Sequence, residues 1–260
     1  MRLKSLSSFL GATAVAVLCF SSLAEAAVVL NPVQDTEIRY GNTADRSTFD
    51  FTNTKNAGDT NGVTRKSYFE FDISTLTEPV TAASTLKFFL SSGTGTDDYD
   101  GGDNVLSVFG LTDETLDAWD DTAITYNTDT GGKVVAPANG TAAAPAGGDT
   151  LDLTKAVLIG DWDIPNSPNP TVDNLPVGLE VSYTGQDLAD FLNADTNGLA
   201  TFILVRTAGS NSAANFSVGT TERSEASGLR PVLTAVSVPE PSSLAVLAIG
   251  GVSVLVRRRK

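Results

Sequence analysis

The sequence contains no histidine and only one cysteine, Cys19. Without histidine, the usual Ser-His-Asp and Cys-His sites of nucleophilic hydrolases cannot be built, and zinc sites with imidazole ligands are excluded as well. Cys19 lies in an N-terminal segment that we expect to be removed, so the mature chain would have neither a thiol nucleophile nor a disulfide. The exported domain must then be held together by its core or by metal, with carboxylates as the remaining catalytic groups.

Basic residues are scarce as well. Residues 27 to 237 include eleven Lys and Arg against twenty-nine Asp and Glu, which is a net charge of −18. A surface of this charge repels phosphate groups, so we do not expect nucleic acid as a partner. It attracts divalent cations, and it also keeps a protein soluble outside the cell.

Residues 1–26 have the pattern of a secretory signal peptide. Arg2 and Lys4 provide a basic start, residues 9–20 an apolar stretch, and Ala24-Glu25-Ala26 a small-x-small cleavage site for signal peptidase. We therefore expect a helical leader that is cut after Ala26.

The C-terminal segment from residue 238 onward combines a Pro-Glu-Pro turn, an apolar run over 244–256 and a basic end. A helix of that run spans about 20 Å at ~1.5 Å per residue, which is less than the ~30 Å hydrocarbon core of a bilayer. Snorkelling arginines and local thinning of the bilayer cover the difference. The terminal cations hold this end in the cytoplasm, so we predict a transmembrane helix here.

In the order of its parts, this segment resembles the PEP-CTERM tail of Gram-negative bacteria, which a membrane exosortase recognises. The resemblance implies export to the cell envelope, the cell surface or the extracellular matrix, with at least transient anchoring in the membrane. A plain C-terminal membrane anchor is the alternative interpretation. The residues that carry the sorting signal are Val238, Pro239, Glu240, Pro241, Arg257, Arg258 and Arg259.

Residues 27–237 have the length of one large all-β domain. Over Ser67–Ile73 apolar and polar residues alternate, which places Phe69 and Phe71 on one face of a strand and Tyr68 and Glu70 on the other. Similar short runs between turn residues predict a β-sandwich of jelly-roll type. Further strands are predicted over residues 28–33, 36–40, 85–90, 105–111, 124–126, 178–183, 199–206, 216–218 and 231–236.

Three other segments depart from this strand pattern. Leu188, Phe191 and Leu192 share a face at helical spacing, so residues 186–192 are predicted to form one short helix that crosses over between strands. Gly131–Gly148 is rich in Gly, Ala and Pro, and Ile164–Pro176 contains four prolines. We interpret both as loops on the surface.

Four segments, taken in order, resemble the DNRLRE type of domain, which is related to carbohydrate-binding module family 96. They are Val33–Arg39, Arg65–Ile73 with its basic pair and Phe-Asp-Ile ending, Trp119 to Asn127, and Glu222–Leu233 with its Arg-Pro-x-Leu strand. The resemblance implies a jelly-roll β-sandwich that accompanies catalytic or matrix modules, some members of which bind acidic polysaccharides.

Five residues near these motifs are candidates for carbohydrate binding. Arg65 and Lys66 can pair with uronate or sulfate groups, and Tyr68, Trp119 and Tyr126 offer rings to the apolar face of a sugar. The alternative for Arg65 is an internal ion pair with Asp72 or another carboxylate. The alternative for Trp119 is a structural corner packed on the core.

Calcium is the one cofactor that the sequence suggests. The run from Asp97 to Asn104 alternates carboxylates with glycines, a pattern of oxygen ligands that calcium favours. A second acidic cluster, Asp113–Asp121, surrounds Trp119. Hairpin turns require similar Asp-Gly sequences, so solvated turns are the alternative for both clusters. The candidate ligands are Asp97, Asp98, Asp100 and Asp103.

Three functions agree with the sequence. The first is an exported, non-catalytic protein that binds or adheres to acidic polysaccharide, and it is our working hypothesis. The second is a coat or matrix protein without a specific ligand. The third is a polysaccharide hydrolase or lyase with two carboxylates about 5–9.5 Å apart in a cleft. Binding predicts an aromatic face exposed beside Arg65 or Lys66, whereas a structural role predicts that these residues are buried and paired.

Overall fold

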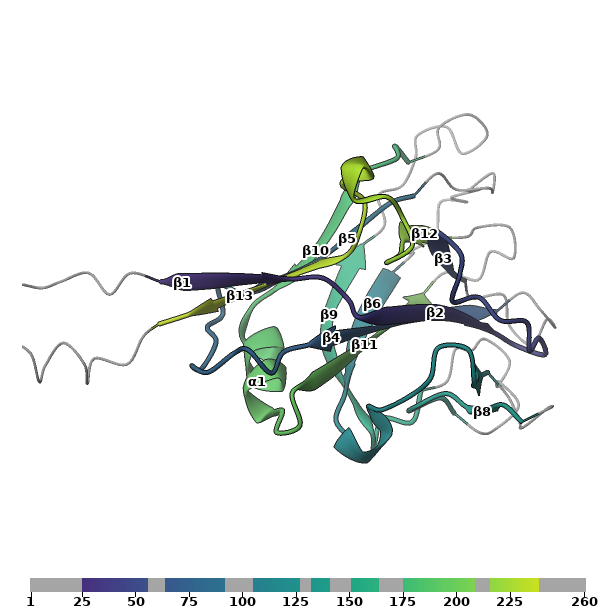
Figure 1. Ribbon diagram of the computed structural model, residues 1–260, viewed down its shortest axis with the longest axis horizontal. Coiled ribbons are helices and arrows are strands. Elements are labelled where there is room, and N and C mark those ends of the chain that lie inside the picture. Colours follow the sequence, from purple (N-terminus) through teal and green to yellow (C-terminus); the bar gives the residue numbers. More distant parts are fainter. Residues whose placement is uncertain are drawn as a thin grey trace, which may run out of the picture.

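The computed structural model describes residues 25–55, 64–91, 105–126, 132–140, 151–163, 175–208 and 216–238. They form two antiparallel sheets that face each other, with two short strand pairs and one α-helix (Figure 1). The predicted all-β sandwich with one short helix is confirmed. The expected signal helix and C-terminal transmembrane helix lie outside the described residues. Within these residues, no helix has the length and apolar character needed to cross a membrane.

The first sheet has four strands. In spatial order they are β1 (Ala26–Leu30), β13 (Val232–Ser237), β5 (Thr85–Phe89) and β10 (Glu180–Thr184). A short 3-10 helix, η2 (Glu225–Ser227), precedes β13. β1 pairs with β13 along its whole length, with Ala26 opposite Ser237. The two ends of the domain therefore leave side by side, as a two-stranded ribbon at one end of the molecule (Figure 1).

The second sheet has five strands. In spatial order they are β2 (Gln34–Arg39), β4 (Arg65–Asp72), β11 (Leu199–Ala208), β6 (Val105–Leu111) and β9 (Ala156–Asp163). The sequence did not predict β9, because its apolar residues do not alternate. Its pairing with β6 shifts register between Val108 and Phe109, so that the neighbours Val157 and Leu158 are both exposed.

The main hydrophobic core fills the space between the two sheets. Phe69 and Phe71 of β4 point into it and are fully buried, as the alternation predicted. The ring of Phe69 contacts Phe88 of β5 at 4.9 Å between centroids, which joins one sheet to the other. Burying each such side chain stabilises the fold by about 1.5–3 kcal/mol.

Helix α1 (Gln186–Ala194) closes one side of the sandwich. Leu188, Phe191 and Leu192 form its buried face, as predicted from their spacing. The helix follows β10 of the first sheet and precedes β11 of the second, so the expected crossover is confirmed. It packs closely on β6 at Gly110, where an added Cβ would lie 2.5 Å from the Phe191 ring.

A second closure comes from the strand pair β3 (Phe51–Thr54) and β12 (Phe216–Gly219). Single bridges join Lys55 to Arg65 at the start of β4, and Leu90 beside β5 to Val218 of β12. The pair therefore connects the second sheet, at the start of β4, with the first sheet, beside β5. β3 escaped prediction because it is short and mostly polar.

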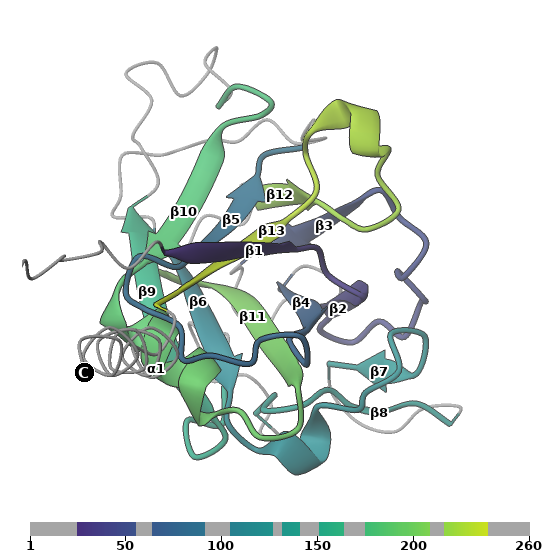
Figure 2. The same ribbon diagram turned by 60° about the vertical axis from the view of Figure 1, so that its left-hand side comes forward.

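The second sheet is also covered on its outer face. Residues 112–126 and 132–140 lie over it and include η1 (Glu114–Leu116) and the parallel pair β7 (Ile124–Thr125) and β8 (Val134–Val135) (Figure 2). Beneath them is a second apolar cluster with Ile38, Tyr68 and Ile203. The expectation that Gly131–Gly148 is a surface loop is therefore wrong for residues 136–139, which are buried.

Candidate functional site

Four of the five predicted binding residues come together in the second apolar cluster. The Tyr68 hydroxyl donates to the backbone oxygen of Pro137 at 2.7 Å, and its ring meets the edge of Trp119 at 5.9 Å. Trp119 Nε1 donates to Thr201 Oγ1 of β11 at 2.9 Å. These contacts fasten the outer layer to the sheet.

Lys66 and Tyr126 belong to the same cluster. The ammonium group of Lys66 lies 4.6 Å from the centre of the Tyr126 ring and donates to Asn139 Oδ1 at 2.6 Å. Asn139 in turn donates to the backbone oxygen of Tyr126. A cation held against a ring and an amide oxygen in this way is stabilised by contacts within the fold.

The predicted exposure of these rings is wrong. Tyr68 and Lys66 are 0 % exposed, Tyr126 is 1 % exposed and Trp119 is 7 % exposed. The sequence pattern placed Tyr68 on the polar face of a half-buried strand, but the outer layer covers that face as well. Only an edge of Trp119 remains accessible.

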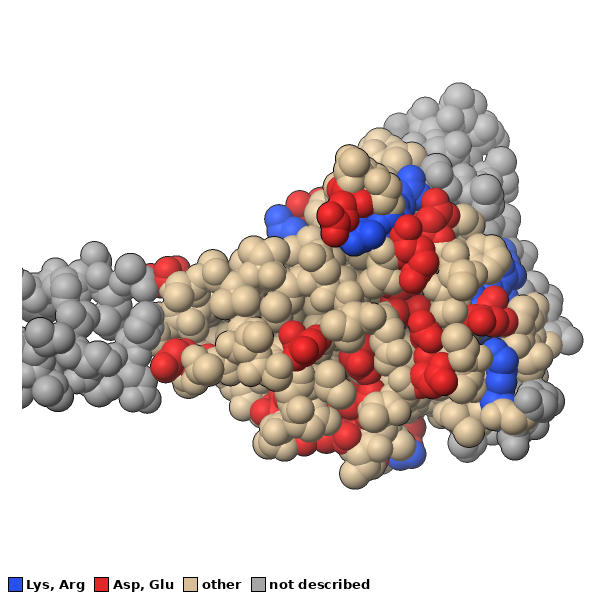
Figure 3. Space-filling view, viewed as in Figure 1, with Lys and Arg blue, Asp and Glu red and all other residues tan. Residues whose placement is uncertain are grey.

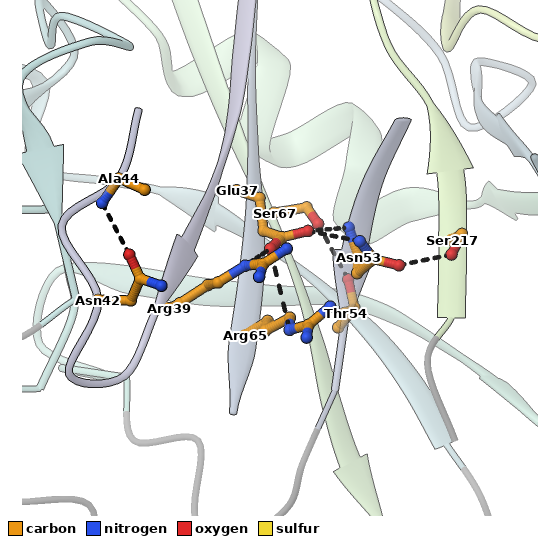
Figure 4. Close-up of polar contacts among 9 residues, drawn as sticks. All are labelled: Glu37, Arg39, Asn42, Ala44, Asn53, Thr54, Arg65, Ser67 and Ser217. Carbon is orange, nitrogen blue, oxygen red and sulfur yellow. Dashed lines mark hydrogen bonds and ion pairs between the residues drawn. The ribbon is translucent and has the colours of Figure 1, made fainter. Parts of the chain in front are cut away.

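Arg65 lies on the other face of β4, in a polar cluster centred on Glu37 (Figure 4). Glu37 of β2 is buried and accepts hydrogen bonds from the backbone N and the Nδ2 of Asn53, each at 2.7 Å. Its other oxygen pairs with Arg39 and lies 3.9 Å from Nε of Arg65. The alternative of an internal ion pair for Arg65 is therefore confirmed, with Glu37 as the partner in place of Asp72.

The guanidinium groups of Arg39, Arg46 and Arg65 all lie near the carboxylate of Glu37. Burial lowers the pKa of Arg65, Glu37 opposes that change, and the nearby positive charges of Arg39 and Arg46 lower it further. Burial and Arg39 act on the pKa of Arg46 in the same direction. Among the described residues, the Nε atoms of Arg46 and Arg65 have no hydrogen-bond acceptor. We call Arg39, Arg46 and Arg65 the arginine cluster.

An exposed aromatic ring adjoins the arginine cluster. Gly41, at φ 66°, allows the chain to turn after β2, and the following loop brings Arg46 over the ring of Phe49 at 4.4 Å. Phe49 is 38 % exposed and stacks edge-on against Phe51. The sequence prediction missed Phe49 and Arg46, because they lie in a loop between the recognised motifs.

A cleft of about 410 Å³ opens in the outer layer. It separates the segment that carries η1 and Trp119 from the segment that carries β8. Its walls are mostly apolar, and Lys155 stands at its margin. The lining residues include Leu116, Trp119, Ile124, Val134, Pro137 and Ala138.

Three buried carboxyl groups have no neighbouring cation among the described residues. Burial raises the pKa of Asp35 to about 7, and Glu222 and Asp121 add to this effect by their negative charge. Burial likewise raises the pKa of Glu70 to about 7 and that of Asp117 to about 6. One oxygen each of Asp35 and Asp117 has no hydrogen-bond partner among the described residues.

The predicted calcium ligands Asp97, Asp98, Asp100 and Asp103 lie outside the described residues. In the second acidic cluster, Asp113 and Asp120 accept hydrogen bonds from Thr115 and Thr122, as turn residues do. Within the parts of the chain that the structure describes, no three acidic side chains converge closely enough to hold a metal ion. Of the sorting residues, Val238 is described, whereas Pro239, Glu240, Pro241, Arg257, Arg258 and Arg259 are not.

Comparison with known families finds two matches along the chain. The family model of carbohydrate-binding module family 96 matches residues 26–157, which is about half of the chain. The match includes the arginine cluster, Phe49 and the cleft beside Trp119, and it ends before the Glu222–Leu233 motif. The PEP-CTERM protein-sorting motif matches residues 237–260. No curated protein matches the chain.

Proposed function

Because the chain belongs to carbohydrate-binding module family 96, we propose that it is an exported, non-catalytic protein that binds acidic polysaccharide through the arginine cluster. The observation that carries the proposal is the set of three partly exposed guanidinium groups around the carboxylate of Glu37, in which the Nε atoms of Arg46 and Arg65 have no acceptor among the described residues. A uronate carboxylate offers two oxygens to such donors, and charge-assisted hydrogen bonds of this kind are short and strong.

The surroundings of the arginine cluster support this ligand. In a domain with a net charge of −18 over residues 27–237, three arginines gather around a single contacting carboxylate. Phe49 adds an exposed ring beside them, suited to the apolar face of a pyranose. On the face shown in Figure 3, Asp and Glu side chains are spread over the described surface, with Lys and Arg side chains in a few places between them.

The sorting motif supports export to the envelope or surface of a Gram-negative-type bacterium. It begins at Ser237, where the β1–β13 ribbon ends. We infer that exosortase processes this tail, that signal peptidase removes residues 1–26, and that the tail anchors the protein in the membrane at least transiently. In this arrangement the arginine cluster, at the end of β2, in the loop after it and at the start of β4, faces away from the membrane.

A coat or matrix protein without a specific ligand is the second candidate function. The observation that favours it is the burial of Lys66, Tyr68 and Tyr126, because a structural role predicts residues that are buried and paired. The two candidates differ in what they require of Arg46, which forms no ion pair with the described residues and is only half-buried. That residue therefore provides the test.

Isothermal titration of purified full-length protein with polygalacturonate tests the proposal. Arg46→Gln should weaken binding about tenfold, the effect of one hydrogen bond to a charged group, and raised salt should weaken the wild type. The control is Lys87→Gln, which removes a cation that is paired with Glu180 on the first sheet at 2.9 Å. Equal losses of affinity in both variants would mean that binding depends on the overall charge of the protein and not on Arg46. Absence of binding by the wild type would favour the structural role.

A further inference from the structure

The cleft beside Trp119 lies on the other side of the second sheet from the arginine cluster. With a volume of about 410 Å³, it is at the small end of the range for ligand sites, about 300–1,000 Å³. It exists because the outer layer is built from small side chains at its margins, among them Ala118, Ala123 and Ala138. A pocket of this size can hold one small ligand, such as a single substituted sugar residue.

Several of the polar atoms around the cleft are already used within the fold. Asn139 holds Lys66 and the backbone of Tyr126, and Trp119 Nε1 is bound to Thr201. The backbone oxygen of Pro137 accepts from Tyr68. A ligand with hydroxyl groups on every side would therefore lose water here and gain few new partners in the interior of the cleft. An apolar group, in contrast, gains by leaving water.

Lys155 gives the margin of the cleft one positive charge. Its Nζ lies 3.6 Å from Asp152, and both side chains are substantially exposed. An exposed pair of this kind is weak, so the ammonium group can turn toward an anionic ligand. The cleft thus combines an apolar interior with one cation, Lys155, and one carboxylate, Asp120, among its lining residues.

We propose that this cleft binds one acetylated residue of an acidic polysaccharide, with the acetyl methyl group inside and a neighbouring carboxylate at Lys155. The proposal rests on the carbohydrate-binding function proposed above and adds a second subsite to it. The family match supports a sugar as the occupant, because it covers residues 26–157 and hence the whole lining from Thr115 to Lys155. An apolar side chain of a partner protein would satisfy the interior but has no need of the cation.

Trp119 provides the readout. The chain has two tryptophans, so Trp162→Phe leaves Trp119 as the single indole of the full-length protein while keeping a ring against Phe216. The probes are polygalacturonate and the same polymer after O-acetylation, which share a backbone and differ in acetyl groups. The acetylated polymer should shift Trp119 emission and bind about fourfold more tightly, the factor for burying one methyl group.

Ala118→Phe should fill the exposed margin of the cleft and abolish the difference between the two polymers. Its control is Ala83→Phe, at an exposed position in the turn before β5, which should preserve the difference. Lys155→Gln should weaken binding of the acetylated polymer.

The outcomes separate this proposal from the one before it. If both polymers bind equally, leave Trp119 emission unchanged and depend on Arg46, the second subsite is wrong and the arginine cluster stands. If Ala118→Phe leaves the acetyl preference intact, the second subsite is again wrong. If neither polymer binds the wild type, both proposals fall. The subsite is established if only the acetylated polymer changes the emission of Trp119 and if Ala118→Phe abolishes that change.

Discussion

The ammonium group of Lys66 is fully buried, 4.6 Å from the centre of the Tyr126 ring and 2.6 Å from Asn139 Oδ1. A residue whose sequence position suggested ligand binding thus holds two parts of the outer layer on the sheet. Lys66→Ala should lower the free energy of unfolding by about 2–4 kcal/mol, because it leaves a cavity and an amide oxygen without its donor. Denaturant titration measures this loss.

The same variant separates a structural role from a binding role. Lys66→Met keeps most of the stem volume and should recover part of the lost stability. The affinity of folded Lys66→Met for polygalacturonate should equal that of the wild type. If Lys66→Met bound polygalacturonate more weakly while keeping the stability of the wild type, Lys66 would have to contact the polymer.

Tyr68→Phe tests how the outer layer is attached. The variant removes one hydrogen bond, from the hydroxyl to the backbone oxygen of Pro137 at 2.7 Å, and should cost about 1 kcal/mol. Amide hydrogen exchange should become faster in residues 132–140 in particular, because this segment opens more easily once the hydrogen bond to Pro137 is gone. Tyr183→Phe removes a comparable bond to Leu106 in the main core and should leave that exchange unchanged. Equal acceleration in both variants would contradict a local role for Tyr68.

The sequence was sufficient to predict the main core and the helix, but it could not predict the outer layer. Alternation along β4 placed Phe69 and Phe71 correctly, because a strand has period two whatever covers its faces. It could not show that Tyr68 is buried as well, since a second layer depends on contacts between distant segments. The ion pair of Arg65 with Glu37 could not be predicted for the same reason. The adjacent strands β2 and β4 bring these two residues together although they are far apart in the chain. Loop residues such as Phe49 carry no periodic signal at all.

Stability should fall as the pH rises from about 4 to about 7. The pKa values of Asp35 and Glu70 are raised to about 7, and that of Asp117 to about 6, above ordinary values of 3.8 to 4.5. The folded state therefore binds these protons more tightly than the unfolded chain, and that advantage is lost once the pH exceeds the folded pKa values. Thermal melting at pH 5 and pH 8 should show the higher midpoint at pH 5.

Asp35→Asn identifies the contribution of a single group. The amide oxygen can still accept from the backbone N of Thr221, which donates to Asp35 at 2.7 Å, while the buried charge is gone. The variant should be more stable than the wild type at pH 8 and should depend less on pH. Asp152→Asn is the control, because hydrogen bonds from Thr154 lower the pKa of this exposed carboxyl. A pH dependence identical to that of the wild type would exclude Asp35 as a contributor.

Close packing of α1 on β6 gives a prediction independent of charge. Gly110→Ala would place a Cβ 2.5 Å from the Phe191 ring, so the helix or the ring must move, at a cost of about 1–3 kcal/mol. Phe191→Leu in the same chain should relieve part of this clash. The two changes together should then cost less than the sum of the single changes, as a double-mutant cycle of melting data can measure. Simple additivity would mean that the ring moves freely.

Glu37 is the residue at which stability and binding should change in opposite directions. It is 4 % exposed and supplies the carboxylate that Arg39 and Arg65 share. Glu37→Gln leaves these guanidinium groups near one another without their anion, and should lower the free energy of unfolding by about 3–5 kcal/mol. A polysaccharide carboxylate at the exposed sides of Arg39 and Arg65 can then supply the missing negative charge.

Polygalacturonate should therefore raise the melting temperature of Glu37→Gln by more than it raises that of the wild type, because a ligand that binds only the native state stabilises it in proportion to its affinity. Asn53→Ala is the matched control, because it removes the Nδ2 hydrogen bond to Glu37 at 2.7 Å and leaves the carboxylate in place. That variant should be less stable without any gain from the polymer. If the polymer stabilises both variants equally, the internal carboxylate and the external one do not compete for the same arginines, and the binding surface lies elsewhere on the sandwich.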